Sequence, residues 1–122
     1  LGKRTKYSYL LKSLQNSGAI LLFGSDFPIE SHNPIAGINA LLNRIPISEK
    51  KRWHPDEIIS LQNALKGYQS DFKLRQSNRL TFLSKNDPAD FTILDKNLFL
   101  LESKKIQTAN VIATFVNGKK VY

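Results

Sequence analysis

Cysteine is absent from the 122-residue sequence, and histidine occurs only at His32 and His54. The lack of cysteine excludes disulfides, thiolate catalysis and cysteine zinc sites. The two histidines do not have the spacing of a local metal motif, so the chain cannot supply a histidine-rich metal site on its own. The longest apolar run, residues 19–23, is far shorter than the ~18 residues of a membrane span. No secretory signal pattern opens the chain, and we therefore expect a cytoplasmic protein.

Methionine is also absent, and the chain begins at Leu1. We therefore expect either a trimmed start or a piece of a longer polypeptide. The apolar fraction of 41% and the charged fraction of 23% are ordinary for a soluble globular protein, which argues against wholesale disorder. The length suits one small domain with a modest core.

Basic residues outnumber acidic ones, 18 to 10, and the formal net charge is +8. Such an excess would permit binding to nucleic acid or to an anionic membrane. The basic residues are spread along the chain in short groups, at 3–4, 50–52, 104–105 and 119–120. They form no basic stripe, and aromatic residues do not interleave with them as a stacking surface needs. We therefore expect no nucleic-acid and no membrane partner, and we interpret these groups as solvated surface.

Residues 1–77 read as helices around one apolar strand. Apolar spacings of three and four predict helices over residues 7–16, 33–46 and from 54 to between 67 and 74. Asn33 is a suitable N-cap, and Pro34 suits the first helical position. Residues 19–23 are continuously apolar, which predicts a strand buried on both faces, as in a parallel sheet or barrel.

Residues 78–122 read as short strands, expected at 80–83, 91–94 and 110–116. Asn117–Gly118 lies between strand-forming residues and predicts a hairpin, because both turn positions need positive φ. The order of elements predicts an α/β element, residues 1–77, joined to a small β element, residues 78–122.

Asp26 is the strongest candidate for chemistry. It stands just after the expected strand at residues 19–23, and active sites of parallel α/β folds are built at that end. A carboxylate there can bind a metal or act as a general base toward water. The alternative is that Asp26 or Ser25 caps a turn before Pro28. His32 lies in the same loop, either as a substrate-loop residue or as a solvent-facing side chain.

Taken in order, these residues resemble the C-terminal part of the amidohydrolase superfamily. Within it, they look most like the amidohydrolase family 3 enzymes, which include N-substituted formamide deformylase. The matching stretches are residues 1–4, 18–19, 22–29 and 33–34, the helix ending in Arg44, residues 64–65 with Tyr68, and residues 89–95 and 114–122. They cover essentially the whole chain. Asn86–Asp87 depart from the family's usual Gly-Lys, but asparagine tolerates the positive φ of a turn.

The resemblance implies an α/β fold, the C-terminal fragment of a metal-dependent hydrolase with a (β/α)8 barrel. Residues 1–77 would hold the last barrel strand with flanking helices, and residues 78–122 would supply strands of a small β-sandwich. Asp26 would contact a divalent metal, zinc by expectation, take a proton from the attacking water and pass it to the leaving nitrogen. The reaction implied is hydrolysis of a C–N bond in an amide-type small molecule.

The other metal ligands of that family, its His-x-His among them, have no counterpart in this sequence. One aspartate does not hold a catalytic zinc, which needs about three protein ligands. We therefore expect the isolated chain to bind no cofactor and to be inactive until the remainder of a barrel, or another copy of the chain, completes it. The alternative is a non-catalytic remnant that acts as a self-associating or partner-binding module.

Overall fold

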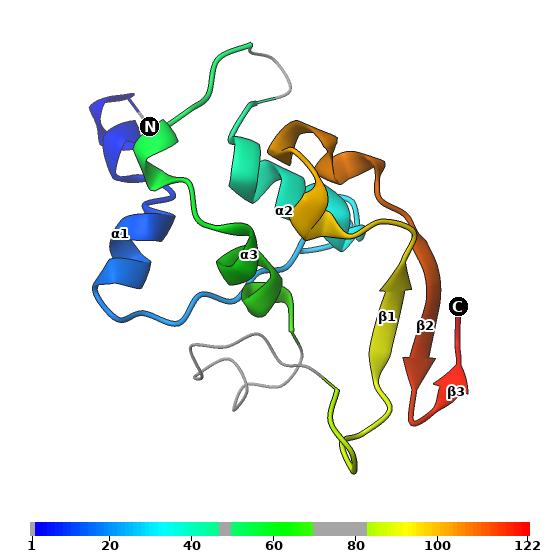
Figure 1. Cartoon of the computed structure of the whole chain (residues 1–122). Helices are drawn as coiled ribbons and strands as arrows, with labels where there is room; N and C mark the ends of the chain where they lie inside the picture. The colour runs from blue at the N-terminus through cyan, green and yellow to red at the C-terminus, as the bar shows by residue number, and fades with distance from the viewer. Residues whose placement is uncertain (1, 47–49, 70–82) are drawn as a thin grey trace. The chain divides into compact units, whose positions relative to one another are not determined.

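The computed structural model describes residues 2–46, 50–69 and 83–122 (Figure 1). The chain divides into two compact units, Leu1–Leu80 and Thr81–Tyr122. The boundary that the sequence predicts near residue 77 lies outside the described residues. Together the elements make a mixed α/β chain with a small antiparallel sheet. In the described part of the chain, no helix has the length and apolar character that a membrane crossing requires.

The described part of the first unit contains α1 (Leu11–Asn16), α2 (Pro34–Asn43), α3 (Leu61–Tyr68) and 3-10 helices at Gly2–Tyr7 and Pro55–Glu57. The buried apolar side chains of this unit are Ile35, Ile38, Leu42, Ile59 and Ala64. They come from α2, α3 and the residue before the cap of α3, so the apolar faces of these two helices supply most of them.

Helix α2 begins where the sequence predicts. The side chain of Asn33 accepts a hydrogen bond from the backbone N–H of Ile35, 3.0 Å away, and Pro34 occupies the first turn. The helix ends earlier than expected, because Arg44 adopts a left-handed conformation with φ of 48°. The N–H of Arg44 still donates to the carbonyl of Ala40, at 2.8 Å, which closes the last turn.

The other two helices begin later than predicted. Tyr9 has a φ of 54°, which interrupts the helix expected at residues 7–16: a 3-10 helix ends at Tyr7, and α1 starts only at Leu11. His54 has a φ of 47°, and Ile58 is extended, so the 3-10 helix Pro55–Glu57 stands apart from α3. Helix α3 starts only after Ser60, whose side chain accepts a hydrogen bond from the N–H of Asn63 at 3.2 Å.

The strand predicted at residues 19–23 is wrong for this structure. Residues 19–25 have no regular secondary structure, and Leu22 is 53% exposed. A strand needs hydrogen-bonded neighbours, and here the backbone bonds to helices instead. The N–H of Ala19 donates to Leu14 of α1, and the N–H of Phe23 donates to Gly67 of α3. The barrel arrangement is therefore not seen among the described residues.

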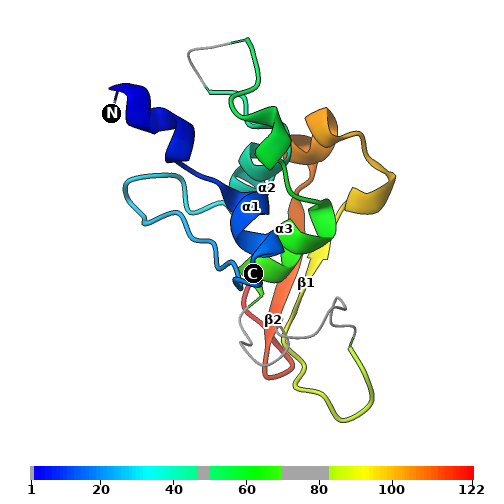
Figure 2. The same ribbon diagram turned by 90° about the vertical axis from the view of Figure 1, so that its left-hand side faces the viewer.

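The second unit contains β1 (Phe91–Leu94), β2 (Val111–Val116) and β3 (Lys119–Lys120), paired antiparallel in that order. Figure 2 shows β1 and β2 side by side. Phe91 pairs with Phe115, and their rings stack with centroids 4.7 Å apart. Both strand predictions are confirmed, the second starting one residue later. The strand expected at residues 80–83 lies outside the described residues except for Leu83, which is not in a strand.

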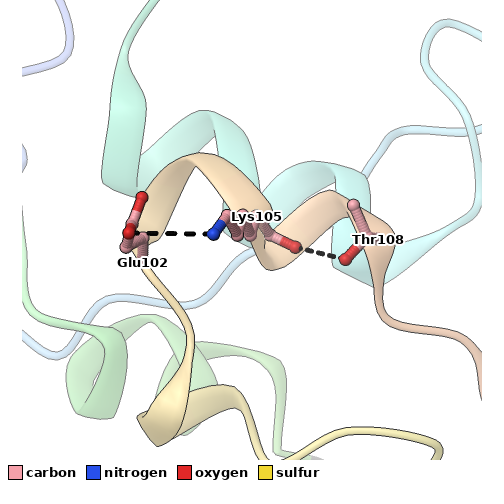
Figure 3. A network of polar contacts seen from close by, with 3 residues as sticks. All are labelled: Glu102, Lys105 and Thr108. Carbon is pink, nitrogen blue, oxygen red and sulfur yellow. Dashed lines mark hydrogen bonds and ion pairs between the residues drawn. The ribbon is translucent and has the colours of Figure 1, made fainter.

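The turns of the second unit follow local chemistry. Asn117 and Gly118 have φ values of 49° and 73°, which confirms the predicted hairpin. Asn86 has a φ of 78°, so it adopts the left-handed turn conformation that the sequence predicts an asparagine can tolerate there. Two 3-10 helices, Leu98–Leu100 and Ser103–Thr108, connect β1 to β2. The second carries an exposed ion pair between Glu102 and Lys105, 3.7 Å apart, beside a hydrogen bond from Thr108 (Figure 3).

Candidate functional site

Asp26 lies in a tight turn after the apolar segment. Its φ is 50°, a left-handed conformation that aspartate tolerates better than most residues. The N–H of Ile29 donates to the carbonyl of Asp26 at 2.9 Å, and the N–H of Glu30 donates to the carbonyl of Ser25 at 3.2 Å. Backbone carbonyls therefore close the turn. Asp26 itself is exposed.

His32 lies in the same loop and is also exposed. Its ring meets the ring of Phe27 edge to face, with centroids 5.5 Å apart. Phe27 follows Asp26 directly and is 66% exposed. The loop then enters α2 through Ser31, whose hydroxyl accepts a hydrogen bond from the N–H of Asn33 at 3.2 Å. The structure thus brings His32 to the residue next to Asp26.

The described residues do not fit a complete catalytic metal site. Among residues 2–46, 50–69 and 83–122, no three His, Cys, Asp or Glu side chains lie close enough together to hold a metal ion. A catalytic zinc usually has three protein ligands and a water. Asp26 could contribute one carboxylate to such a site, and the other ligands would have to come from elsewhere.

The segment that leads to Asp26 is attached to the end of α3. The N–H of Phe23 donates to the carbonyl of Gly67 at 3.0 Å. The ring of Phe23 packs against that of Tyr68, with centroids 5.9 Å apart. Burial raises the pKa of Tyr68 above its ordinary value. The hydroxyl of Tyr68 lies against Gly37 of α2. These contacts connect α2, α3 and the Asp26 loop.

Arg44 is a buried cation that the sequence interpretation missed, because it treats basic residues as solvated surface. Its side chain is only 8% exposed. Its Nε donates to the carbonyl of Trp53 at 2.9 Å, and its Nη2 donates to the carbonyl of Tyr9 at 3.2 Å. The guanidinium also lies over the Trp53 ring, 5.3 Å from its centroid. Burial lowers the pKa of Arg44, and the charge of Glu57 opposes that effect.

These contacts make Arg44 a structural residue. It ties the end of α2 to the backbone at Tyr9 and Trp53, and among the described residues these contacts lie outside the Asp26 loop. The sequence offered only a local indication of this position. Pro46 predicts that α2 ends before it, and Arg44 is the residue at which the helix ends. Neither the burial of the guanidinium nor its partners could be read from that signal.

The chain matches the sequence model described as "Amidohydrolase family" over residues 2–122. It is 38% identical over 123 residues to the Arabidopsis thaliana protein named LONG AFTER FAR-RED 3, covering 98% of this chain and 21% of that protein. It is 28% identical over 128 residues to YtcJ of Bacillus subtilis (strain 168), a protein named as an amidohydrolase, covering 100% of this chain and 24% of YtcJ. No solved structure matches. The chain therefore spans less than a quarter of the length of these curated relatives.

Proposed function

Because this chain belongs to the amidohydrolase family, we propose that it is the C-terminal segment of a hydrolase that cleaves a C–N bond in an amide-type small molecule. The observation that carries the proposal is the family match over residues 2–122. The exposed carboxylate of Asp26, in the loop after an apolar segment, supports it from the residues themselves. Small N-substituted amides, formamides among them, are the first substrates to try.

The role proposed for Asp26 is proton transfer. Its carboxylate accepts a proton from water as the water oxygen bonds to the amide carbon. The C–N bond then breaks, and the leaving nitrogen takes the proton from the Asp26 carboxyl. Each proton that Asp26 accepts is thus returned within one turnover. His32 and its neighbour Phe27 lie in the same loop, so we propose that they contact the substrate.

A divalent metal ion, zinc in the first instance, belongs to the complete enzyme in this proposal. The described residues do not form its site. The other ligands would come from the remainder of a barrel or from another copy of the chain. The steps assigned to this chain therefore involve only Asp26. We expect the isolated 122-residue chain to be inactive and to bind no zinc with an affinity tighter than about micromolar.

A second candidate function is a non-catalytic module that associates with itself or with a partner. Exposed apolar side chains near Asp26 favour it, namely Ile20, Leu22, Phe27 and Ile29. Covering such side chains is a common basis of association. Sedimentation velocity on the isolated chain measures this directly, because a self-associating module shows a concentration-dependent mass.

The test of the hydrolase uses the natural polypeptide that contains this chain, defined by reading the coding sequence in frame upstream of Leu1. Release of amine from a panel of N-substituted amides is measured for the natural sequence, Asp26→Asn and Glu30→Gln. Asp26→Asn removes the proton acceptor, and we expect kcat to fall by about 100-fold or more. Glu30→Gln alters another exposed carboxylate of the same loop and should change kcat little.

Two results would overturn the proposal. An Asp26→Asn variant with undiminished kcat would remove the role of that carboxylate. A natural polypeptide with no upstream His-x-His and no amide hydrolysis would favour the non-catalytic module. A zinc titration of the isolated chain that revealed a stoichiometric tight site would contradict the expectation that its ligands lie elsewhere.

A further inference from the structure

The carbonyl of Gly67 is free to bind outside its own helix. Helix α3 ends at Tyr68, and the last four carbonyls of a helix have no partner within it. The N–H of Phe23 donates a hydrogen bond to the Gly67 carbonyl, with the two atoms 3.0 Å apart. The apolar segment that precedes Asp26 is thereby fixed to the end of α3 through its backbone.

Gly67 also allows an unusually close approach. A Cβ atom at this position would collide with two ring carbons of Phe23 and would lie 3.2 Å from the carbonyl oxygen of Leu21. Only a residue without a side chain leaves that room. The ring of Phe23 has little freedom to move aside, because it packs against Tyr68, whose hydroxyl in turn lies against Gly37 of α2.

Asp26 follows this anchor by three residues, in a turn of its own. Within the described part of the chain, residues 19–25 pair with no strand, and the Phe23–Gly67 hydrogen bond is the backbone contact nearest before the Asp26 turn. We propose that Gly67 is a positioning residue for Asp26, acting through Phe23. This inference rests on the proposed function of Asp26, but the docking that it describes can be measured without activity.

The first test is Gly67→Ala in the 122-residue chain, followed by NMR. Alanine normally favours a helix over glycine, so without the close approach this variant would be at least as stable as the parent. We expect instead that amide exchange at Phe23 becomes about tenfold faster or more. The amide resonances of Asp26 and Ile29 should shift, whereas exchange at Ile38 of α2 should not change.

A double variant, Gly67→Ala with Phe23→Ala, separates positioning from general damage. Removing the ring removes the main collision, so the amide at residue 23 should regain protection and the Asp26 and Ile29 resonances should return toward their original positions. Unchanged exchange and shifts in Gly67→Ala would overturn the proposal. Equal acceleration at Phe23 and Ile38 would also overturn it, because it would show only a loss of global stability.

The same variants belong in the hydrolase assay of the natural polypeptide. There a positioning role predicts a lower kcat with KM unchanged for Gly67→Ala. If Asp26→Asn keeps full activity, the proposed function fails while the NMR result still decides whether Gly67 fixes the loop. If Asp26→Asn is inactive and Gly67→Ala is normal in both assays, the positioning role alone fails.

Discussion

The carboxylate of Glu57 caps helix α1 from a distant part of the chain, through Ser13. It accepts hydrogen bonds from the backbone N–H of Ser13, at 2.9 Å, and from its hydroxyl, at 2.5 Å. The residue that precedes the helix, Leu10, offers no side-chain cap. Because the first N–H groups of a helix lack internal partners and favour a negative charge, Glu57 supplies what the local sequence does not.

The substitution Glu57→Gln should lower the urea midpoint of unfolding. Glutamine keeps the shape of the side chain but removes the charge that the α1 N-terminus favours. Trp53 is the only tryptophan, so its fluorescence reports unfolding of this unit. Asp56→Asn, in the same 3-10 helix, is the matched control. Equal midpoints for the two variants would show that the charge of Glu57 at the α1 N-terminus does not stabilise the chain.

The contribution of Glu57 should also depend on pH. The hydrogen bonds from Ser13 hold the pKa of Glu57 below its ordinary 4.5. A carboxyl with a lowered pKa in the folded state stabilises the protein fully above the unfolded pKa and loses this contribution as the pH falls through the folded pKa. The difference in midpoint between the parent and Glu57→Gln should therefore be constant near neutrality and shrink below about pH 4.5. A difference that grows in acid would contradict this.

Asp95, in the second unit, is also a carboxylate that hydrogen bonds hold in its charged form, and its contribution to stability should likewise depend on pH. Its Oδ1 accepts from the backbone N–H of Asn110 at 2.8 Å, and its Oδ2 accepts from the Asn110 side chain at 2.9 Å. The backbone bond and then the side-chain bond lower the pKa of Asp95. We expect Asp95→Asn to accelerate amide exchange in β2 above pH 3.8, where the parent carboxyl is charged.

The control for Asp95 is Glu102→Gln. The partner of Glu102 is Lys105, and the two side chains are 74% and 63% exposed. Exposed ion pairs contribute about 0–1 kcal/mol, so this loss should leave β2 exchange nearly unchanged. If Asp95→Asn and Glu102→Gln accelerated amide exchange in β2 equally, the Asp95–Asn110 hydrogen bonds would not stabilise β2 more than an exposed ion pair does.

Elements with local causes could be predicted from the sequence. Helix α2 starts at Asn33–Pro34 because one side chain and one fixed φ suffice to start it. The hairpin at Asn117–Gly118 needs only two residues that tolerate positive φ. The loop containing Asp26 and His32 also lies directly after the apolar segment, as the order of residues indicates. The catalytic role of Asp26 stays a prediction.

Features with distant causes could not be predicted. The apolar pattern of residues 19–23 indicates that both faces of this segment can be buried. A strand also needs neighbouring strands to pair with. Here the carbonyl of Gly67 instead accepts a single hydrogen bond from the N–H of Phe23. The late start of α1 depends on the positive φ of Tyr9, whose carbonyl accepts a hydrogen bond from Arg44 at the end of α2. Gly67 is 44 residues from Phe23 and Arg44 is 35 residues from Tyr9, so no local window of sequence contains these partners.

Gly37 should be intolerant of a side chain. A Cβ at this position would collide with the hydroxyl of Tyr68. Overpacking of this kind costs about 1–3 kcal/mol, more than the ~1 kcal/mol that alanine gains over glycine in a helix. Gly37→Ala should therefore lower the free energy of unfolding, measured by urea denaturation. Gly24→Ala, where nothing lies within 4 Å, is the control. Adding Tyr68→Phe should recover part of the loss, because it removes the colliding oxygen.

Gly118→Ala tests strain without a collision. The φ of Gly118 is 73°, and a Cβ there would meet only the Cβ of Ala89, at an ordinary 3.7 Å. The cost should therefore be conformational, about 1–2 kcal/mol for a left-handed alanine. Gly118→Asn should cost less, because asparagine tolerates this conformation. Urea denaturation followed by far-UV circular dichroism, with amide exchange at Phe115, measures both variants. The Gly118 N–H also donates to the Ala89 carbonyl at 3.0 Å. If alanine and asparagine were equally destabilising, the loss would come from the close approach of Gly118 to Ala89, including this hydrogen bond. It would then not come from the backbone conformation of residue 118.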